Sequence, residues 1–356
     1  MSVTLPSDLL ALLEAVKDHP ASDVHRLVLA DWLEEYGRDN AERARAAFIR
    51  LQCQRARLLA DNWDHRILTA QPHYQELLAQ EAALRAAHLP SWLGAWHSWI
   101  ARPDNEAAWF QRGLLRPWVE GLQWLEEVPD DPAAWAWVDG LVVLSCPAEE
   151  VQRLAASPVL GRLNALDLGA CGWGIGDAGA RALASSPHLA RLTTLVLTDT
   201  GIGPAGARAL AESPYLSQLT SLELLGFDYT TSNHIGDEGM RAVAGSEHMA
   251  RLTCLRLPEN GITAEGARAL AASAYLGGLT YLELSANPVG PEGARALASS
   301  LFLNRLTYLG LQLSSSRFHS AGHGVQADAD ELEAAREVLR RRFGKAWSGE
   351  TRATGG

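Results

Sequence analysis

The chain has 356 residues, of which 47% are hydrophobic and 21% are charged, and its formal net charge is -11. This composition is typical of a folded protein with about two domains and argues against wholesale disorder. Residues 1–112 carry a net charge of -3 and the remaining residues carry -8, so neither part has the basic charge typical of nucleic-acid binders.

The sequence also indicates where the protein is located and the state of its cysteines. We expect no membrane span and no secretory signal, because the chain has no stretch of about 18 apolar residues and no basic segment followed by an apolar run at its amino terminus. The four cysteines are far apart and form no C-x-x-C pair, so neither a disulfide framework nor a structural zinc site is expected. A cytoplasmic location with reduced thiols is the simplest expectation.

The amino-terminal part is predicted to be helical. Apolar residues recur at helical spacing in residues 4–18, 23–37 and 40–59, and a fourth helix is predicted for residues 74–87.

The third predicted helix carries a basic stripe, because Arg43, Arg50 and Arg57 are seven residues apart. Such a stripe can engage an acidic partner or nucleic acid. Pairing with neighbouring carboxylates, such as Glu34 and Glu35, is the favoured interpretation.

Two segments of this part, LADWLEEYG at residues 29–37 and RAAFIRLQ at residues 45–52, resemble the bacterial repeat-companion domain. That family is a short helical module at the amino terminus of proteins with leucine-rich or other repeats. The resemblance covers about residues 5–58 and implies an architecture without an activity. FQRG at residues 110–113 is similar to a segment that follows this module, which implies a strand near residues 114–118.

The next segment is rich in tryptophan, with 8 of the 12 tryptophans between residues 92 and 137. An aromatic binding surface is one interpretation. Because Trp92, Trp96 and Trp99 fit one face of a helix, packing of the helical module onto the first repeat is favoured.

The carboxy-terminal part repeats with a period of 27 residues. Each unit has an L-x-x-L-x-L segment, which alternates like a strand, and an alanine-rich G-A-R-A-L-A segment, which is predicted to be a short helix. The aligned leucines are Leu166, Leu195, Leu222, Leu255, Leu282 and Leu309.

A polar residue follows each predicted strand and can bond the exposed backbone of a turn from one repeat to the next. These residues are Thr200, Asn233, Asn260 and Asn287, and Trp173 stands at the equivalent place in the first full unit. The pattern resembles the ribonuclease-inhibitor-like leucine-rich repeats over residues 141–313. This predicts an α/β leucine-rich-repeat solenoid, with parallel strands on a concave face and helices on a convex face, after an all-α module.

We therefore predict five regions. They are a helical repeat-companion module at 1–60, a tryptophan-rich helical junction with a degenerate first strand at 61–137, leucine-rich repeats at 138–313, a loop and capping helix at 314–343, and a tail at 344–356.

No catalytic, cofactor or metal site is predicted. The chain lacks a phosphate-binding loop and a G-x-S-x-G nucleophile elbow. His319 and His323 are four residues apart, but they lie in a loop-like stretch without nearby ligands, so a solvated loop is favoured over a metal site.

Partner-binding residues are expected where side chains alternate with the core leucines and line the concave face. These are Asp167, Val196, Glu223, Arg256 and Glu283, with Tyr281 and Tyr308 beside them. A secondary set comprises the insertion residues Phe227 and Tyr229 and one aromatic per repeat at the helix exit, His188, Tyr215, His248, Tyr275 and Phe302. For this aromatic column, packing between loops is favoured over binding.

The predicted function is a non-enzymatic scaffold that binds an unknown protein or peptide, with no cofactor and no membrane or nucleic-acid partner. The alternative is a regulatory adaptor whose Arg-rich helix engages an acidic partner or nucleic acid.

Overall fold

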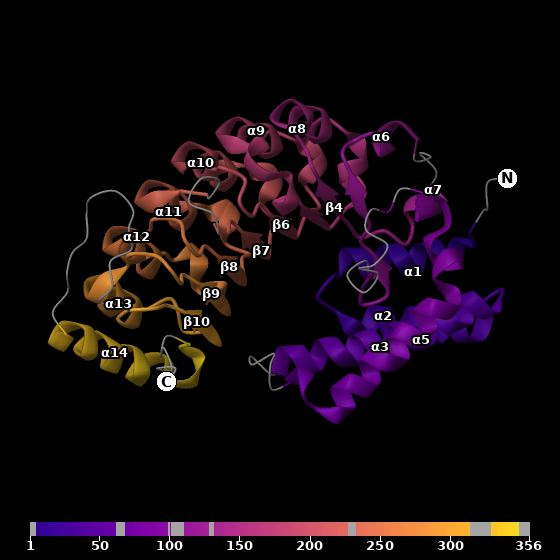
Figure 1. Ribbon diagram of the computed structural model, residues 1–356, viewed down its shortest axis with the longest axis horizontal. Helices are drawn as coiled ribbons and strands as arrows, with labels where there is room; N and C mark the ends of the chain where they lie inside the picture. Colours follow the sequence, from indigo (N-terminus) through magenta and orange to yellow (C-terminus); the bar gives the residue numbers. More distant parts are fainter. Residues whose placement is uncertain are drawn as a thin grey trace, which may run out of the picture. The chain divides into compact units, whose positions relative to one another are not determined.

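The computed structural model describes residues 5–61, 68–98, 100, 110–127, 132–226, 233–313 and 329–348. The chain divides into two compact units (Figure 1). Unit 1 comprises residues 1–142 and 162–164, and unit 2 comprises residues 143–161 and 165–356.

Unit 1 is mainly helical. Its helices are α1 (Ser7–Asp18), α2 (Asp23–Tyr36), α3 (Asn40–Asp61), α5 (Pro72–Leu93), α6 (Trp124–Glu127) and α7 (Pro132–Trp135), and η1 (Gly94–Ser98) is a 3-10 turn. Its short strands are β1 (Phe110–Gln111), β2 (Leu114–Leu115) and β3 (Trp118–Glu120). The four predicted helices are present, and the fourth is longer than predicted. The strand expected at 114–118 is divided in two around Pro117, since proline has no N–H group for a strand ladder.

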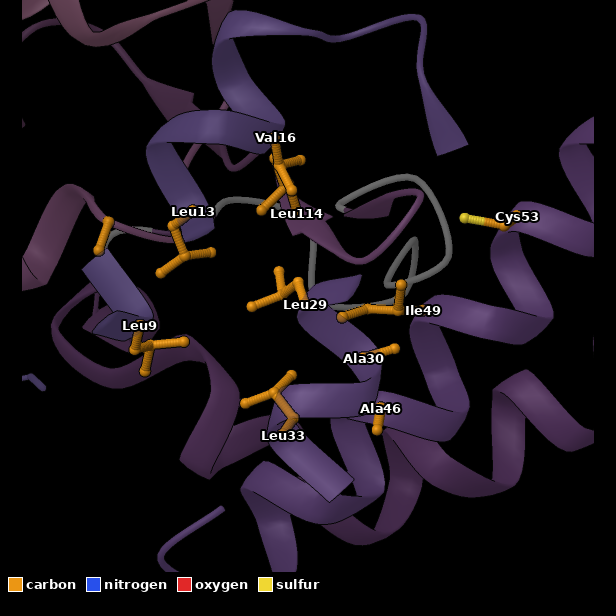
Figure 2. Close-up of a cluster of buried hydrophobic side chains, with 11 residues drawn as sticks. Leu9, Leu13, Val16, Leu29, Ala30, Leu33, Ala46, Ile49, Cys53 and Leu114 are labelled. Carbon is orange, nitrogen blue, oxygen red and sulfur yellow. The ribbon is translucent and has the colours of Figure 1, made fainter. Parts of the chain in front are cut away.

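The core of unit 1 forms where the apolar faces of its first three helices meet (Figure 2). Each helix contributes residues three or four apart, the spacing that brings side chains onto one helix face. The cluster consists of Leu9, Leu13, Val16, Leu29, Ala30, Leu33, Ala46, Ile49, Cys53, Leu114 and Ala136.

The FQRG segment is tied to α3. The ring of Phe110 is buried and packs edge-on against Phe48, with 5.1 Å between centroids. Gly113 has a φ of +89° and its N–H group donates to Gln52 Oε1 at 2.7 Å. A Cβ atom at Gly113 would lie 2.2 Å from Cγ1 of Ile49, so only glycine fits both the backbone angle and the contact.

Several tryptophans of unit 1 are packing residues. Trp96, Trp124 and Trp135 are buried against one another, with 4.8 Å between the rings of Trp96 and Trp135. The indole N–H of Trp92 donates to the carbonyl oxygen of Ala41 at 2.8 Å. These four rings pack within unit 1, which confirms packing over a binding surface for them. Trp99 and Trp109 lie outside the described residues.

Unit 2 alternates strands with helices. The strands are β4 (Gly140–Leu144), at the boundary between the units, β5 (Ala165–Asp167), β6 (Thr194–Val196), β7 (Ser221–Glu223), β8 (Cys254–Arg256), β9 (Tyr281–Glu283) and β10 (Tyr308–Gly310). The helices are α8 (Ala148–Ala155), α9 (Gly176–Ala184), α10 (Pro204–Glu212), α11 (Gly236–Gly245), α12 (Ala264–Ala271), α13 (Gly290–Ala298) and α14 (Ala329–Phe343). From β5 to β10 neighbouring strands follow one another in chain order.

The leucine alignment is confirmed by the strand register. From β5 to β10 the strands pair in parallel, and the aligned leucines are direct partners from Leu166 through to Leu309. Figure 1 shows the strands of unit 2 along one side and helices α9–α13 along the other. Unit 2 is therefore an α/β leucine-rich-repeat solenoid, as the sequence predicts.

The polar column after the strands is also confirmed. Asn260 is fully buried, and its amide nitrogen donates to the carbonyl oxygens of Leu224 and Pro258 at 2.6 and 2.9 Å. Its own N–H group donates to Asn287 Oδ1 at 2.9 Å. Because each asparagine bonds the backbone of its own repeat and of the preceding one, this column, which we call the asparagine ladder, joins consecutive repeats.

A second ladder was not anticipated from the sequence. One buried serine per repeat donates its hydroxyl to an alanine carbonyl near the end of the helix in the preceding repeat, at 2.5–2.6 Å. The signal was present, because a serine stands two residues before each residue of the aromatic column. The serines are Ser186, Ser213, Ser246, Ser273 and Ser300.

The carboxy-terminal end of unit 2 is covered by α14, which buries Leu332, Ala335 and Leu339. The tail predicted from residue 344 is wrong for residues 344–348. Trp347 is buried, pairs in parallel with Leu309 and donates its indole N–H to the carbonyl oxygen of Leu311 at 3.0 Å.

Gly113→Ala should lower the free energy of unfolding by about 2–4 kcal/mol, because the new methyl group collides with Ile49 while φ stays in the left-handed region. Gly94→Ala is the matched control, since Gly94 has a φ of +52° but a Cβ there meets no atom within 4 Å. Its cost should be smaller, because it comes from backbone strain alone. Equal losses in urea unfolding would show that the Ile49 contact is unimportant.

Candidate functional site: the outward face of the strands

Period-two alternation places a column of side chains on the face of the sheet opposite the core leucines. The pairing register sets Asp167, Val196, Glu223, Arg256 and Glu283 beside one another in that order. The structure therefore brings the predicted central column together. It also shows that several of these side chains are paired or buried and do not face solvent freely.

Glu223 and Arg256 form an ion pair across β7 and β8, with 2.9 Å between Oε2 and Nη1. Burial raises the pKa of Glu223, and the nearby Asp167 carboxylate raises it further, against the opposing effect of Arg256. The Arg256 side chain keeps 36% of its surface exposed, and that of Glu223 keeps 20%. Arg256 is thus the member of the pair that faces solvent more.

Glu283 is not displayed as predicted, because it is only 9% exposed. Its carboxylate accepts hydrogen bonds from the Tyr308 hydroxyl and from the Ser285 N–H group, each at 2.9 Å. A Cβ atom at Gly310 would lie 2.1 Å from Glu283 Oε1, so the absence of a side chain there makes room for the carboxylate. Glu283 holds the Tyr308 hydroxyl in place and is a poor candidate for direct contact with a partner.

The two tyrosines form a stacked pair, with 4.2 Å between ring centroids and 10° between planes. The Arg256 guanidinium lies 6.0 Å from the centroid of the Tyr281 ring. Burial raises the pKa of Tyr281 and of Tyr308, so both phenols are neutral at ordinary pH. We call Glu223, Arg256, Tyr281, Tyr308 and Glu283 the Arg–Tyr cluster.

The chemistry of the Arg–Tyr cluster suits recognition. It offers partly exposed aromatic faces and a guanidinium held in place by Glu223, while its phenols are protonated and therefore weak nucleophiles. Val196 is partly exposed and adds an apolar spot, and Asp167 accepts a hydrogen bond from the Gly169 N–H group at 2.9 Å.

Four of the five residues of the predicted aromatic column lie on the 3-10 turns that follow the helices, and Phe302 lies in a bend at the equivalent place. These turns are η5 (Pro187–Leu189), η6 (Pro214–Leu216), η7 (Glu247–Met249) and η8 (Tyr275–Gly278). Tyr215, Tyr275 and Phe302 are 37%, 43% and 38% exposed, whereas His188 and His248 are less exposed. Leu301, which sequence reasoning missed, is 82% exposed beside Phe302. The insertion residues Phe227 and Tyr229 lie outside the described residues.

The arginines of α3 are largely engaged within unit 1. Arg50 contacts Asp31 at 2.7 Å and Glu34 at 2.6 Å. Arg57 contacts Asp23 at 2.9 Å, while Arg43 is exposed. Pairing with carboxylates is confirmed for Arg50 and Arg57.

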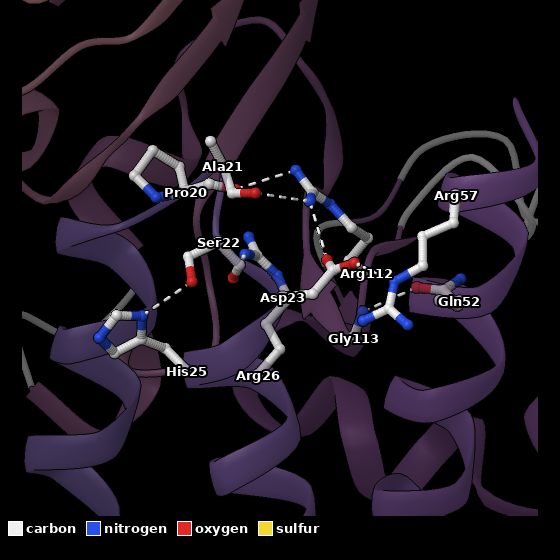
Figure 3. A network of polar contacts seen from close by, with 10 residues as sticks. All are labelled: Pro20, Ala21, Ser22, Asp23, His25, Arg26, Gln52, Arg57, Arg112 and Gly113. Atoms are coloured by element: carbon white, nitrogen blue, oxygen red, sulfur yellow. Dashed lines mark hydrogen bonds and ion pairs between the residues drawn. The ribbon is translucent and has the colours of Figure 1, made fainter. Parts of the chain in front are cut away.

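Asp23, the first residue of α2, is the centre of a polar network (Figure 3). It accepts hydrogen bonds from Arg57 Nε at 2.9 Å and from Arg112 Nη1 at 3.0 Å, and Arg112 also donates to the Pro20 carbonyl oxygen at 2.9 Å. Burial alone would raise the pKa of Asp23, but the two guanidinium groups outweigh it and hold the pKa below its usual value.

Within the described residues, no group of three or more His, Cys, Asp or Glu side chains is arranged to hold a metal ion. His319 and His323 fall outside them. No helix in the described part of the chain is long and apolar enough to cross a membrane.

Comparison with protein families agrees with this architecture. The Leucine Rich repeat family matches four segments, at residues 188–211, 231–244, 248–271 and 279–298. All four lie in the carboxy-terminal part, which therefore contains leucine-rich repeats. No curated protein matches the sequence.

The Asp23 network predicts a pH-dependent stability. Because the folded pKa is below the unfolded value, the unfolded chain takes up a proton first, so this stabilisation is present above about pH 4 and is lost as pH falls through the folded pKa. Asp23→Asn should cost about 1 kcal/mol at pH 7, a modest figure because the network is partly open to solvent. The cost should shrink towards pH 3.

Urea titrations of wild type and variant at several pH values measure this difference. Asp31→Asn removes the same charge from an exposed ion-pair partner of Arg50 and serves as the control. A pH-independent cost for Asp23→Asn would contradict the electrostatic account.

Proposed function

We propose that this protein is a non-enzymatic scaffold whose leucine-rich repeats bind a protein or peptide on the face formed by β5–β10. The observation that supports this most is the register itself. It sets outward side chains from consecutive repeats beside one another in a continuous surface, on a backbone held by buried ladders.

Arg256, Tyr281 and Tyr308 are the proposed centre of contact, with Val196 and Asp167 beside them. Arginine and tyrosine are enriched among the interface residues that contribute most to binding free energy. Glu223 and Glu283 take a supporting role, because Glu223 holds Arg256 and Glu283 accepts a hydrogen bond from the Tyr308 hydroxyl. Held side chains lose less conformational entropy when a partner binds.

We further propose that unit 1 contains a bacterial repeat-companion domain and that the repeats are of the ribonuclease-inhibitor-like type. The tight fit of Gly113 and Phe110 against α3 supports the first assignment, since it explains why the FQRG segment has a phenylalanine and a glycine at these positions. A cytoplasmic location stays a prediction from the sequence. The adaptor alternative loses support, because carboxylates engage Arg50 and Arg57.

Affinity capture from a lysate of the source cells tests the binding face. The variant Thr194→Arg/Val196→Arg adds two long cations to partly exposed positions of β6. The control Ala178→Arg/Ala205→Arg adds the same charge to exposed positions of α9 and α10 in neighbouring repeats. We expect mass spectrometry to show partners that the wild type and the control retain and that the strand variant loses by about tenfold or more, as a loss of about 1.4 kcal/mol of binding free energy would give.

Equal retention by both variants would contradict binding on this face. It would direct attention to the exposed residues Tyr275, Leu301 and Phe302.

A further inference from the structure

Two cysteines that are distant in sequence meet in unit 2. Cys146 follows β4, and Cys171 lies in the 3-10 turn η4 (Gly169–Gly174) of the next repeat. The Cys171 S–H group donates to the carbonyl oxygen of Val143 at 3.2 Å, and the two thiols are close enough to shift each other's pKa. The separation of 25 residues is close to one repeat period, so the solenoid stacks the two positions although no C-x-x-C motif marks them.

The backbones of the two segments are packed closely enough for a covalent link. The Ser145 N–H group donates to the Ala170 carbonyl oxygen at 3.4 Å, one residue before each cysteine. A disulfide needs Cα atoms about 4.4–6.8 Å apart, so segments in direct backbone contact can be joined by one. Gly174 permits this approach, because a Cβ there would lie 2.8 Å from the Cys146 carbonyl oxygen.

We propose that Cys146 and Cys171 form an oxidation site, a dithiol that hydrogen peroxide or a similarly small peroxide converts to a reversible disulfide between the first two repeats of unit 2. The two other cysteines of the chain, Cys53 and Cys254, provide internal comparisons. The oxidant must be small because Cys146 is fully buried, while Cys171 is partly exposed.

The mutual effect of the two thiols favours the first step. The neighbouring Cys171 thiol lowers the pKa of Cys146, while the pKa of Cys171 is raised, so the pair ionises at the Cys146 sulfur. By contrast, burial raises the pKa of Cys53 to about 12 and also raises the pKa of Cys254.

The reaction balances with one peroxide. The Cys146 thiolate attacks a peroxide oxygen, the O–O bond breaks, and hydroxide leaves while Cys146 becomes a sulfenic acid. Hydroxide then takes the proton of Cys171, giving water, and the Cys171 thiolate attacks the Cys146 sulfur. The S–S bond forms and a second hydroxide leaves. The two sulfurs lose two electrons, which reduce the peroxide.

The test uses the full-length protein, reduced, desalted and exposed to hydrogen peroxide before free thiols are blocked with N-ethylmaleimide. We expect the count of free thiols to fall from four to two and to return to four after dithiothreitol. Arg153 and Arg162 lie between the cysteines, so trypsin separates the two peptides unless they are cross-linked. Mass spectrometry should find the Cys146 and Cys171 peptides joined, with Cys53 and Cys254 alkylated.

The variants Cys146→Ser and Cys171→Ser should each abolish the link, whereas Cys254→Ser should keep it. Circular dichroism of each variant verifies its fold. Oxidation of Cys53 or Cys254 as readily as of the pair would overturn the proposal. So would a thiol count that stays at four in native wild type under conditions that oxidise dithiothreitol.

Discussion

The asparagine ladder is the constraint on which unit 2 depends. A repeat of one short strand and one short helix leaves backbone groups of its turn without partners, and a buried N–H or carbonyl group without a hydrogen bond is costly. Asn287 meets this need with its whole amide, accepting from the N–H groups of Asn260 and Ile262 and donating to the carbonyl oxygens of Leu257 and Leu284. The hydrogen bonds that satisfy these backbone groups are therefore the same bonds that join consecutive repeats.

The packing of this interior determines the arrangement of side chains on the outward face of the strands. Once the leucines and ladder residues fix the register, each outward side chain meets the same neighbours on the adjacent strands. That fixed neighbourhood produces the Glu223–Arg256 ion pair and the Tyr281–Tyr308 stack. The same stacking brings the segments of Cys146 and Cys171 together, so the proposed recognition surface and the proposed oxidation site both depend on the geometry of the repeat.

The features that follow from the repeat period could be predicted from the sequence. The features that depend on contacts between residues distant in the sequence could not. Leucine spacing gave the strands, the register and the column of outward residues. It could not show that Glu283 would turn under Tyr308, because the space at Gly310 exists only after the strands pair. Nor could it show that Trp347 would pair with Leu309, since that contact closes across a long stretch of chain.

Native-state hydrogen exchange of Asn260→Ala tests most directly whether the ladder joins the repeats. The account predicts faster exchange in the repeats on both sides, including the N–H group of Ile235 in the preceding repeat, with the same change absent from Asn304→Ala, which alters an exposed asparagine. Faster exchange confined to the turn of Asn260 itself would contradict the account, because the repeats would then be held by their leucines alone.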